Sequence, residues 1–534
     1  MTPTAVNRRD QHQSLILKAA ISSRLLLLSL ILLWRAFVQP YDTSAPLNPD
    51  CLAANTAAVA PPPPPSSAAI PLPGVASAIE SSVVWDSVYF VRIAECGYEY
   101  EQTYAFLPLL PACISLLSRT LFAPLVSIIG LRAVLALSGY AVNNLAFVAA
   151  AVYFYRVSII ILGDADAALR ASILFCFNPA SIFYSSIYTE SLYSLFSLGG
   201  LYYLITGASN VAVLCFALSA SARSNGVLNA GYFCFQTMHL AYDAVFVKRH
   251  ACLAARVLIV GALRCVCTFL PFVAFQAYGY YNICHGRSPD KMSPWCKGKV
   301  PLLYNYIQSH YWGVGFLRYF QLKQLPNFML ASPILSLALC SILHYVRSQP
   351  EIFLSLSFRA SNEEKRIAAS WSSPDTLDAS IVVPSKEKSS SKRQGKFSLS
   401  MVVISESAAT YDMFFNITML LENRQLRQRK QMKEEDDHVS LFPQHASLEK
   451  PGYLSAFIFP CTLHLGFMSA TAFFIMHVQV ATRFLSASPP LYWFACRVMI
   501  SPHFSRRWGH IIWAYSIAYI LLGSLLFSNF YPFT

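Results

Sequence analysis

Apolar stretches of about twenty residues recur along most of this chain, and they restrict its fold more than any other feature. A stretch of this length is sufficient to cross the hydrocarbon core of a bilayer as an α-helix. Of the 534 residues, 55% are apolar and only 13% are charged, whereas soluble domains are about one quarter charged. The sequence therefore predicts an all-α polytopic membrane protein.

The excess of basic residues fits a membrane protein better than a nucleic-acid-binding one. The net charge is +13, and basic loops on the cytosolic side contact anionic lipid headgroups. We expect membrane lipids, and no nucleic acid, among the binding partners. Most of the fourteen cysteines lie in apolar runs, but Cys284 and Cys296 flank a polar loop. The sequence leaves open whether these two form a disulfide or stay as free thiols.

Hydropathy predicts a helix bundle with about eight to eleven membrane spans and lumenal loops. Basic residues near the start predict a cytosolic N-terminus. Residues 347–450 are rich in charge and serine and are predicted to be disordered. The only N-x-[ST] sequon begins in this insertion, at Asn416. The predicted segments are a cytosolic N-terminus (1–20), a first transmembrane helix (21–38), a lumenal loop with a proline-rich linker (39–104), a bundle (105–346), the charged insertion (347–450) and C-terminal transmembrane helices (451–534).

Asp86 is the first candidate for chemistry, in the acidic and aromatic segment WDSVYFVRIAECGYEYEQTYAF. A carboxylate beside Trp and Tyr rings at a membrane face is suited to accept a proton from a sugar hydroxyl, because partial desolvation raises its basicity. The alternative is an interfacial aromatic belt with solvated acids. The same ambiguity applies to Glu99 and Glu101.

Two further polar groups interrupt apolar runs. In FNPASIFYSSIYTESLYSLF, Glu190 is difficult to place facing lipid and is expected to face a cavity or to cap a helix. In SARSNGVLNAGY, a buried Arg223 needs an anion, which is either a phosphate or a protein carboxylate such as Glu190. Polar residues of these segments also serve in helix packing, so both interpretations stay open.

Nucleotide-binding and hydrolase motifs are absent from the sequence. It contains no Walker A loop, HExxH or GxSxG element, so ATPases, zincins and α/β-hydrolases have no support. Asp164 and Asp166 match a DxD pattern literally, but they are predicted to lie in a short turn between apolar runs.

Five segments resemble, in the same order, the signature blocks of the GPI mannosyltransferase 2 family. The resemblance covers roughly residues 80–345 and 452–530, but not the proline-rich linker or the insertion. The blocks are WDSVYFVRIAECGYEYEQTYAFLPLLP, FNPASIFYSSIYTESLYSLFSLGGLYY, SARSNGVLNAGY, PWC with PLLYNYIQSHYWGVGFLRYF, and HVQVATRFLSASPPLYWF.

This resemblance implies an endoplasmic-reticulum membrane enzyme of the GT-C superfamily. It would transfer the second mannose, in α-1,6 linkage, from dolichol-phosphate-mannose to the GPI-anchor lipid intermediate. Inversion from a β-linked donor implies one general base, and Asp86 matches the family's first-loop aspartate. No cofactor or metal is expected, and an accessory membrane subunit is left open. The expected substrate-binding residues are Trp85, Arg92, Tyr98, Glu99, Glu101, Asn178, Tyr188, Glu190, Arg223, Asn225, Gln308, His310, Trp312, His477 and Arg483.

Two other classes remain as alternatives. In a multipass transporter, Arg223 and Glu190 would be substrate or proton sites near the midplane. In a catalytically inactive subunit of a glycosylation complex, the same polar groups would be structural. A lumenal-face pocket with Asp86 favours the transferase, whereas a midplane site between repeats favours transport.

Overall fold

The structure is a computed structural model, and it describes residues 3–41, 51–52, 70–286, 292–358, 456–500 and 507–531. The chain divides into two units, residues 1–381 with 451–534 and residues 382–450. The predicted proline-rich linker at 61–65, nearly all of the predicted insertion and the sequon at Asn416 lie outside the described residues. The account below concerns the first unit.

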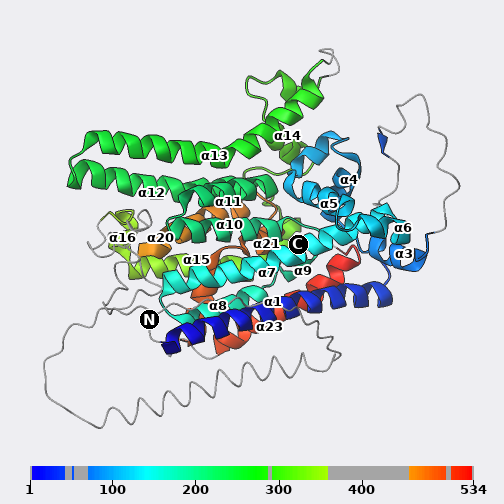
Figure 1. Ribbon diagram of the computed structural model, residues 1–534, viewed down its shortest axis with the longest axis horizontal. Coiled ribbons are helices and arrows are strands. Elements are labelled where there is room, and N and C mark those ends of the chain that lie inside the picture. The colour runs from blue at the N-terminus through cyan, green and yellow to red at the C-terminus, as the bar shows by residue number, and fades with distance from the viewer. Residues whose placement is uncertain are drawn as a thin grey trace, which may run out of the picture. The chain divides into compact units, whose positions relative to one another are not determined.

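Helices make up the regular structure of the described residues, as the apolar pattern predicts (Figure 1). The α-helices are α1 (Pro3–Phe37), α3 (Pro73–Ser81), α4 (Asp86–Cys96), α5 (Leu109–Arg119), α6 (Val126–Ile129), α7 (Leu131–Leu162), α8 (Ala165–Cys176), α9 (Ser181–Ser185), α10 (Glu190–Ile205), α11 (Ser209–Ala222), α12 (Ala230–Tyr242), α13 (Ala251–Cys284), α14 (Leu303–His310), α15 (Leu325–Ser348), α16 (Pro350–Leu354), α20 (Phe459–Phe474), α21 (Ala481–Leu485), α22 (Pro489–Ile500) and α23 (Arg507–Ser528). Short helical turns join them: η1 (Glu101–Ala105), η2 (Ala123–Leu125), η3 (Ser224–Asn229), η4 (Asp243–Val247), η6 (Pro294–Lys297), η7 (Leu322–Gln324), η9 (Ala456–Ile458) and η10 (Val478–Val480).

Five helices in the described part of the chain are long and apolar enough to span a membrane, or six if one bent pair counts as a single span. The bent pair joins Leu109–Arg119 to Ala123–Ile129 at an angle of 71°. The five are Arg9–Phe37, Leu131–Leu162, Ala251–Cys284, Leu322–Ser348 and Arg507–Ser528. This number is below the eight to eleven spans that hydropathy predicts.

Breaks inside apolar runs explain the difference. The predicted run at 170–205 is divided among α8, α9 and α10, with the expected break near Asn178. The run at 211–237 is divided between α11 and α12 by the polar turn η3. Each resulting helix is shorter than the roughly twenty residues that a full crossing needs. The first helix, in contrast, begins at Pro3 rather than near residue 21, because polar residues ahead of the apolar core continue the same helix.

A buried arginine of the first helix stabilises one of these breaks. The Arg24 guanidinium donates hydrogen bonds to the carbonyl oxygen of Ser181 and to the hydroxyl of Ser185, both at 3.0 Å. It also lies 3.8 Å from the centre of the Phe147 ring. These contacts supply partners to polar groups that the interruption leaves free inside an apolar bundle.

Segments that are far apart in the sequence lie side by side in the bundle. Helix α1 packs against α7, α8 and α23, so the first and last described helices are neighbours (Figure 1). Helices α12 and α13 form a long pair that also contacts α11. The candidate site is carried by α4, α10, α21 and the residue between α11 and η3.

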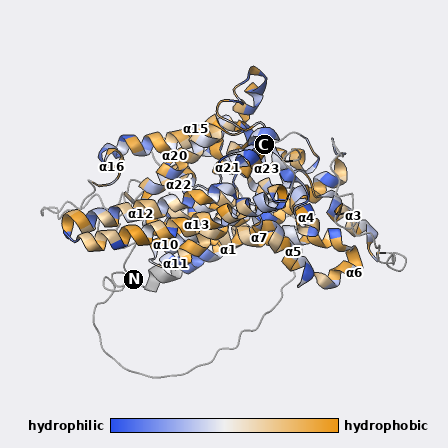
Figure 2. Ribbon diagram, turned by 90° about the horizontal axis from the view of Figure 1, so that it is seen from above, coloured by the Kyte–Doolittle hydropathy of each residue, from blue (hydrophilic) through white to orange (hydrophobic). Residues whose placement is uncertain are grey.

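Helix α13 leaves most of its apolar surface uncovered by the protein. Only 11% of its most apolar window is buried, and side chains such as Ile259 (69% exposed) and Leu263 (61% exposed) face outward. Figure 2 shows hydrophobic residues along both α12 and α13. An apolar surface of this extent on a long helix fits contact with lipid acyl chains.

The loops near α4 and α14 form a separate cluster that is fixed by covalent bonds. Cys284 and Cys296 form a disulfide, which settles the alternative that the sequence leaves open. A second disulfide joins Cys51 to Cys96, the last residue of α4. Disulfides form and persist in oxidising compartments, which fits the prediction of a lumenal loop at 39–104. Tyr104 of η1 packs in the same cluster as the Cys284 region.

The two disulfides predict a defined thiol count. Under denaturing, non-reducing conditions, ten of the fourteen cysteines should react with a thiol-specific label, and all fourteen should react after reduction. Intact-mass measurement of the purified protein gives both numbers. Labelling of all fourteen cysteines without reduction would contradict the assignment.

Replacing Cys51 with serine should lower stability by about 2–5 kcal/mol, because the bond closes a long loop in the unfolded chain. The measurement is thermal unfolding of the detergent-purified protein. Cys252→Ser is the matched control, since Cys252 is a free, exposed cysteine, and it should leave the unfolding temperature nearly unchanged.

Candidate active site

Four charged side chains form a continuous series of ion pairs between helices that are distant in sequence. Arg483 Nη1, in α21, lies 3.4 Å from Asp86 Oδ2 and 3.9 Å from Glu190 Oε1. Glu190 Oε1 also pairs with the guanidinium of Arg223. The formal charges of the four groups sum to zero, which limits the cost of holding ionised groups in poorly solvated surroundings.

Exposure differs strongly along this series. The Glu190 side chain is 2% exposed, whereas that of Asp86 is 39% exposed. Asp86 is therefore the acidic group that a substrate can reach. Among the described residues, neither Glu190 Oε2 nor Arg483 Nε has a hydrogen-bond partner, although both atoms are buried. Such atoms leave capacity for a ligand or a water molecule.

Both carboxylates stand at helix starts. Asp86 is the first residue of α4, and Glu190 is the first residue of α10. Free backbone N–H groups and the helix dipole make this end of a helix favourable for negative charge. The local sequence thus places both acids where a helix favours negative charge, before their arginine partners are considered.

The backbone just before Asp86 is held in an uncommon conformation. Trp85 has a φ of 56°, in the region that side chains other than glycine rarely adopt. Its indole Nε1–H donates a hydrogen bond to the carbonyl of Phe527 at 3.1 Å, and its ring packs against Phe530 at 5.7 Å. Such strain persists where surrounding contacts enforce it, and it is concentrated at functional sites.

Aromatic rings orient the Arg483 guanidinium. It lies 5.2 Å from the centre of the Phe183 ring and 5.5 Å from that of Tyr188. The Tyr188 hydroxyl in turn accepts a hydrogen bond from the backbone N–H of Asp86 at 3.1 Å. Burial acts to lower the pKa of Arg483, but the charges of Asp86 and Glu190 outweigh it, so this pKa lies above its ordinary value. Arg483 is therefore a permanent cation next to Asp86.

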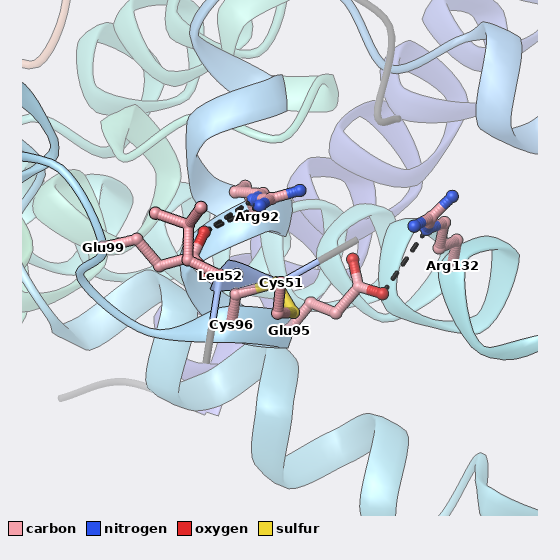
Figure 3. The surroundings of a disulfide bond; sticks show 7 residues. All are labelled: Cys51, Leu52, Arg92, Glu95, Cys96, Glu99 and Arg132. Carbon is pink, nitrogen blue, oxygen red and sulfur yellow. Dashed lines mark hydrogen bonds and ion pairs between the residues drawn. A yellow bond between two sulfur atoms is a disulfide. The ribbon is translucent and has the colours of Figure 1, made fainter. Parts of the chain in front are cut away.

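A second group of predicted site residues surrounds the Cys51–Cys96 disulfide (Figure 3). Arg92 Nη2 lies 2.7 Å from Glu99 Oε2, and Arg92 Nε donates to the same oxygen at 3.0 Å. The other oxygen of Glu99 accepts from the backbone N–H of Leu52 at 2.5 Å. Arg92 and Glu99 thus join the segment at Cys51 to the end of α4.

The donor atoms of Cys51, Cys96 and Glu99 lie within 4.8 Å of one another, but they do not make a metal site. Metal binding by cysteine requires thiolates, and these two sulfurs are bonded to each other. Glu99 is already occupied by Arg92.

Glu101 and Tyr98 lie among the loops near α4 and α14, in the part of the chain that carries the second disulfide. Glu101 Oε1 accepts a hydrogen bond from Trp295 Nε1–H at 2.6 Å, and Oε2 accepts one from the Tyr311 hydroxyl at 2.9 Å. The Tyr98 hydroxyl donates to the carbonyl of Phe106 at 2.8 Å. Burial and the hydrogen bond to Glu101 raise the pKa of Tyr311 to about 12, so this hydroxyl remains a donor at neutral pH.

The remaining predicted residues do not join the ion-pair series. Asn178 is fully buried and caps a turn, with its Oδ1 accepting from the N–H of Ala180 at 2.8 Å. Asn225 follows Arg223 closely in sequence, but its Nδ2 contacts Met468 Sδ at 3.9 Å. Both contacts fit the packing alternative that the sequence leaves open.

Residues from the predicted blocks after position 300 form aromatic contacts. His310 is exposed and stacks on Tyr306. The half-buried Trp312 contacts Phe106 edge-on at 6.1 Å. His477 stacks on Tyr319 at 4.7 Å. The carbonyl of Gln308 accepts a hydrogen bond from the N–H of Val314 at 2.9 Å.

Several residues that contact the candidate site side chains could not be identified from the sequence. Phe183, Trp295 and Tyr311 hold site side chains, but aromatic residues are too common in this chain for their positions to be informative. Cys51 was detectable in principle. It lies in a polar, alanine- and proline-rich segment rather than in an apolar run, which favours a disulfide over packing.

The family model and the curated relatives that match this chain indicate the same family. The family model described as "Mannosyltransferase (PIG-V)" matches residues 12–534. No solved structure matches this chain.

The curated relatives carry related names. GPI alpha-1,6-mannosyltransferase 2 of Homo sapiens is 30% identical over 387 residues, covering 67% of this chain and 74% of the relative. The protein of the same name from Cricetulus griseus is 30% identical, covering 67% of this chain and 73% of the relative. GPI mannosyltransferase 2 of Drosophila pseudoobscura pseudoobscura is 28% identical, covering 84% and 86%. This chain therefore belongs to the mannosyltransferase (PIG-V) family of glycosyltransferases.

Proposed function

We propose that this protein transfers mannose, in α-1,6 linkage, from dolichol-phosphate-mannose to the GPI-anchor lipid intermediate at the lumenal face of the endoplasmic reticulum. The names of the relatives support the acceptor and the linkage. The observation that carries the proposal is the contact between the exposed carboxylate of Asp86 and a permanent cation, Arg483. This arrangement offers a base and an anion-binding group side by side.

The disulfides support a lumenal site. Helix α4 begins at Asp86 and ends at Cys96, so its ends are about 15 Å apart at a rise of about 1.5 Å per residue. Cys96 is bonded to Cys51, which requires an oxidising compartment. Asp86 would therefore lie within one short helix of the lumen.

Asp86 is proposed as the general base of a single inverting displacement. Its carboxylate accepts the proton of an acceptor hydroxyl, whose oxygen forms the new bond to C1 of mannose. The bond from C1 to the phosphate oxygen breaks, and dolichol phosphate leaves with the electron pair. The guanidinium of Arg483, 3.4 Å away, is proposed to hold this carboxylate in position for the acceptor hydroxyl.

Arg483 is also proposed to hold the phosphate of the donor. Its Nε is buried and has no hydrogen-bond partner among the described residues, and a guanidinium fork matches phosphate oxygens. Arg223 is paired with Glu190. Of the two partners that the sequence leaves open for Arg223, the contact with a protein carboxylate is the one this structure contains. We assign Arg223 a positioning role.

The rival classes differ in what they require of Asp86. A transporter needs polar sites near the midplane, whereas Asp86 lies at one end of a short helix whose other end carries a disulfide. An inactive subunit would not need an exposed base at a strained helix start.

The function test is complementation of cells that lack this mannosylation step, scored by surface GPI-anchored protein and by the accumulating lipid intermediate. Expression at normal level without either recovery would overturn the proposal.

Asp86→Asn should keep the size of the side chain but remove the base, lowering the rate of mannose transfer by about 10²- to 10⁴-fold. Transfer is measured in microsomes at equal protein abundance. Asp243→Asn is the matched control, because Asp243 is similarly exposed and pairs only with surface Lys248 in the described structure. A near-normal rate for Asp86→Asn would remove this residue from the mechanism.

Neutral replacements of Arg223 and Glu190 should show strong interaction in a double-mutant cycle. Each single change, Arg223→Met or Glu190→Gln, leaves the other charge buried and should destabilise the protein, whereas the double variant should lose about 1–3 kcal/mol less than the sum. Thermal unfolding of the purified proteins gives the comparison.

The exposed pair Asp243 and Lys248 is the control cycle, and its single effects should be small and additive. Strictly additive losses of stability at Arg223 and Glu190, or normal stability in both single variants, would contradict the positioning role.

A further inference from the structure

A partly open cavity of about 480 Å³ lies among the loops near α4 and α14, apart from the ion-pair series. We infer that it is a subsite for a sugar ring of the acceptor's glycan, at a distance from the hydroxyl that reacts. The inference rests on the proposed function and adds a location and a ligand class to it. The residues that line the cavity include Tyr98, Tyr100, Glu101, Tyr104, Tyr278 and Asn282.

The size and lining of the cavity suit a carbohydrate. Small-molecule sites usually measure about 300–1,000 Å³ and combine aromatic surfaces with a few directed polar groups. Tyr100 is 39% exposed and Tyr278 is 50% exposed, so their rings are accessible to a ligand. The C–H face of a pyranose packs on such rings, while its hydroxyls need hydrogen-bond partners.

Glu101 supplies hydrogen-bond acceptors. Each of its carboxylate oxygens accepts one hydrogen bond, from Trp295 or Tyr311. A carboxylate offers about four acceptor positions in total, so capacity for sugar hydroxyls remains. No cation pairs with Glu101 among the described residues. The neighbouring Glu99, in contrast, is neutralised by Arg92.

Covalent bonds make the walls of the cavity rigid. Tyr98 follows Cys96 by two residues, and Asn282 precedes Cys284 by two, so each of the two disulfides adjoins one wall. Asn282 Nδ2 donates to the Tyr104 hydroxyl at 3.2 Å, which links the two walls. A preorganised site of this kind loses little conformational entropy when it binds a ligand.

Aromatic contacts connect the cavity to the candidate base. The Tyr98 hydroxyl donates to the carbonyl of Phe106, and the Phe106 ring stacks on Tyr89 at 4.7 Å. Tyr89 lies one helical turn after Asp86 in α4. The length of α4, about 15 Å from end to end, corresponds to the reach of an oligosaccharide rather than of one sugar. The cavity therefore suits a sugar ring remote from the reacting hydroxyl.

The test measures binding separately from turnover. The probe is the delipidated glycan of the GPI intermediate, titrated by calorimetry into purified Asp86→Asn protein, in which turnover is blocked. Adding Tyr100→Ala should weaken binding about tenfold, since loss of one stacking ring corresponds to about 1.4 kcal/mol. Tyr281→Ala is the matched control, because Tyr281 is on α13, is 65% exposed and does not line the cavity.

In microsomes, Tyr100→Ala alone should raise the apparent KM for the acceptor and leave that for the donor unchanged. Unchanged glycan binding in Tyr100→Ala, or no glycan binding by a protein that does transfer mannose, would overturn the inference. Failure of the proposed function has a different signature, because the unsubstituted protein would then transfer no mannose at all.

Discussion

Mutual neutralisation of four charges inside an apolar helix bundle is the interaction on which the candidate site depends. A lone Glu190 or Arg223 would be too costly to bury, but the series from Asp86 through Arg483 and Glu190 to Arg223 carries no net charge. Each member lies on a different element, so their pairing ties together α4, α10, α21 and the turn after α11. The site is thus a structural junction of the bundle as well as a candidate centre of chemistry.

The members of this junction could be identified from the sequence, but their pairing could not. Glu190 and Arg223 are conspicuous because charged residues in apolar runs are expensive. Asp86 stands out in an acidic and aromatic segment, and Arg483 lies in a segment that resembles a family block. Asp86 and Arg483, however, are separated by 397 positions, and no local pattern encodes a contact over that distance. The position of Phe183 is not informative in the sequence, because aromatic residues are common in this chain whereas charges in apolar runs are rare.

For the fold as well, composition predicts the class of structure but not its geometry. Apolar content predicts an all-helical membrane protein, which the structure confirms. The number of spans does not follow from hydropathy, because a break such as the one near Asn178 converts one apolar run into several short helices. The Cys51–Cys96 bond shows a related limit, since a spacing of 45 residues carries no recognisable motif. Cys284 and Cys296 are closer in sequence and flank a polar loop, which makes a disulfide between them one of the two alternatives that the sequence suggests.

The hydrogen bond from Trp85 to Phe527 spans 442 positions, and it has a consequence for how the protein is made. Trp85 and Asp86 are synthesised early in translation, long before the ribosome reaches Arg483 and Phe527. Until those residues arrive, nothing enforces the uncommon backbone conformation at Trp85, and the cation beside Asp86 is missing. The candidate site would therefore be completed among the last events of biosynthesis, so a chain still attached to the ribosome would lack the proposed pairing of Asp86 with Arg483.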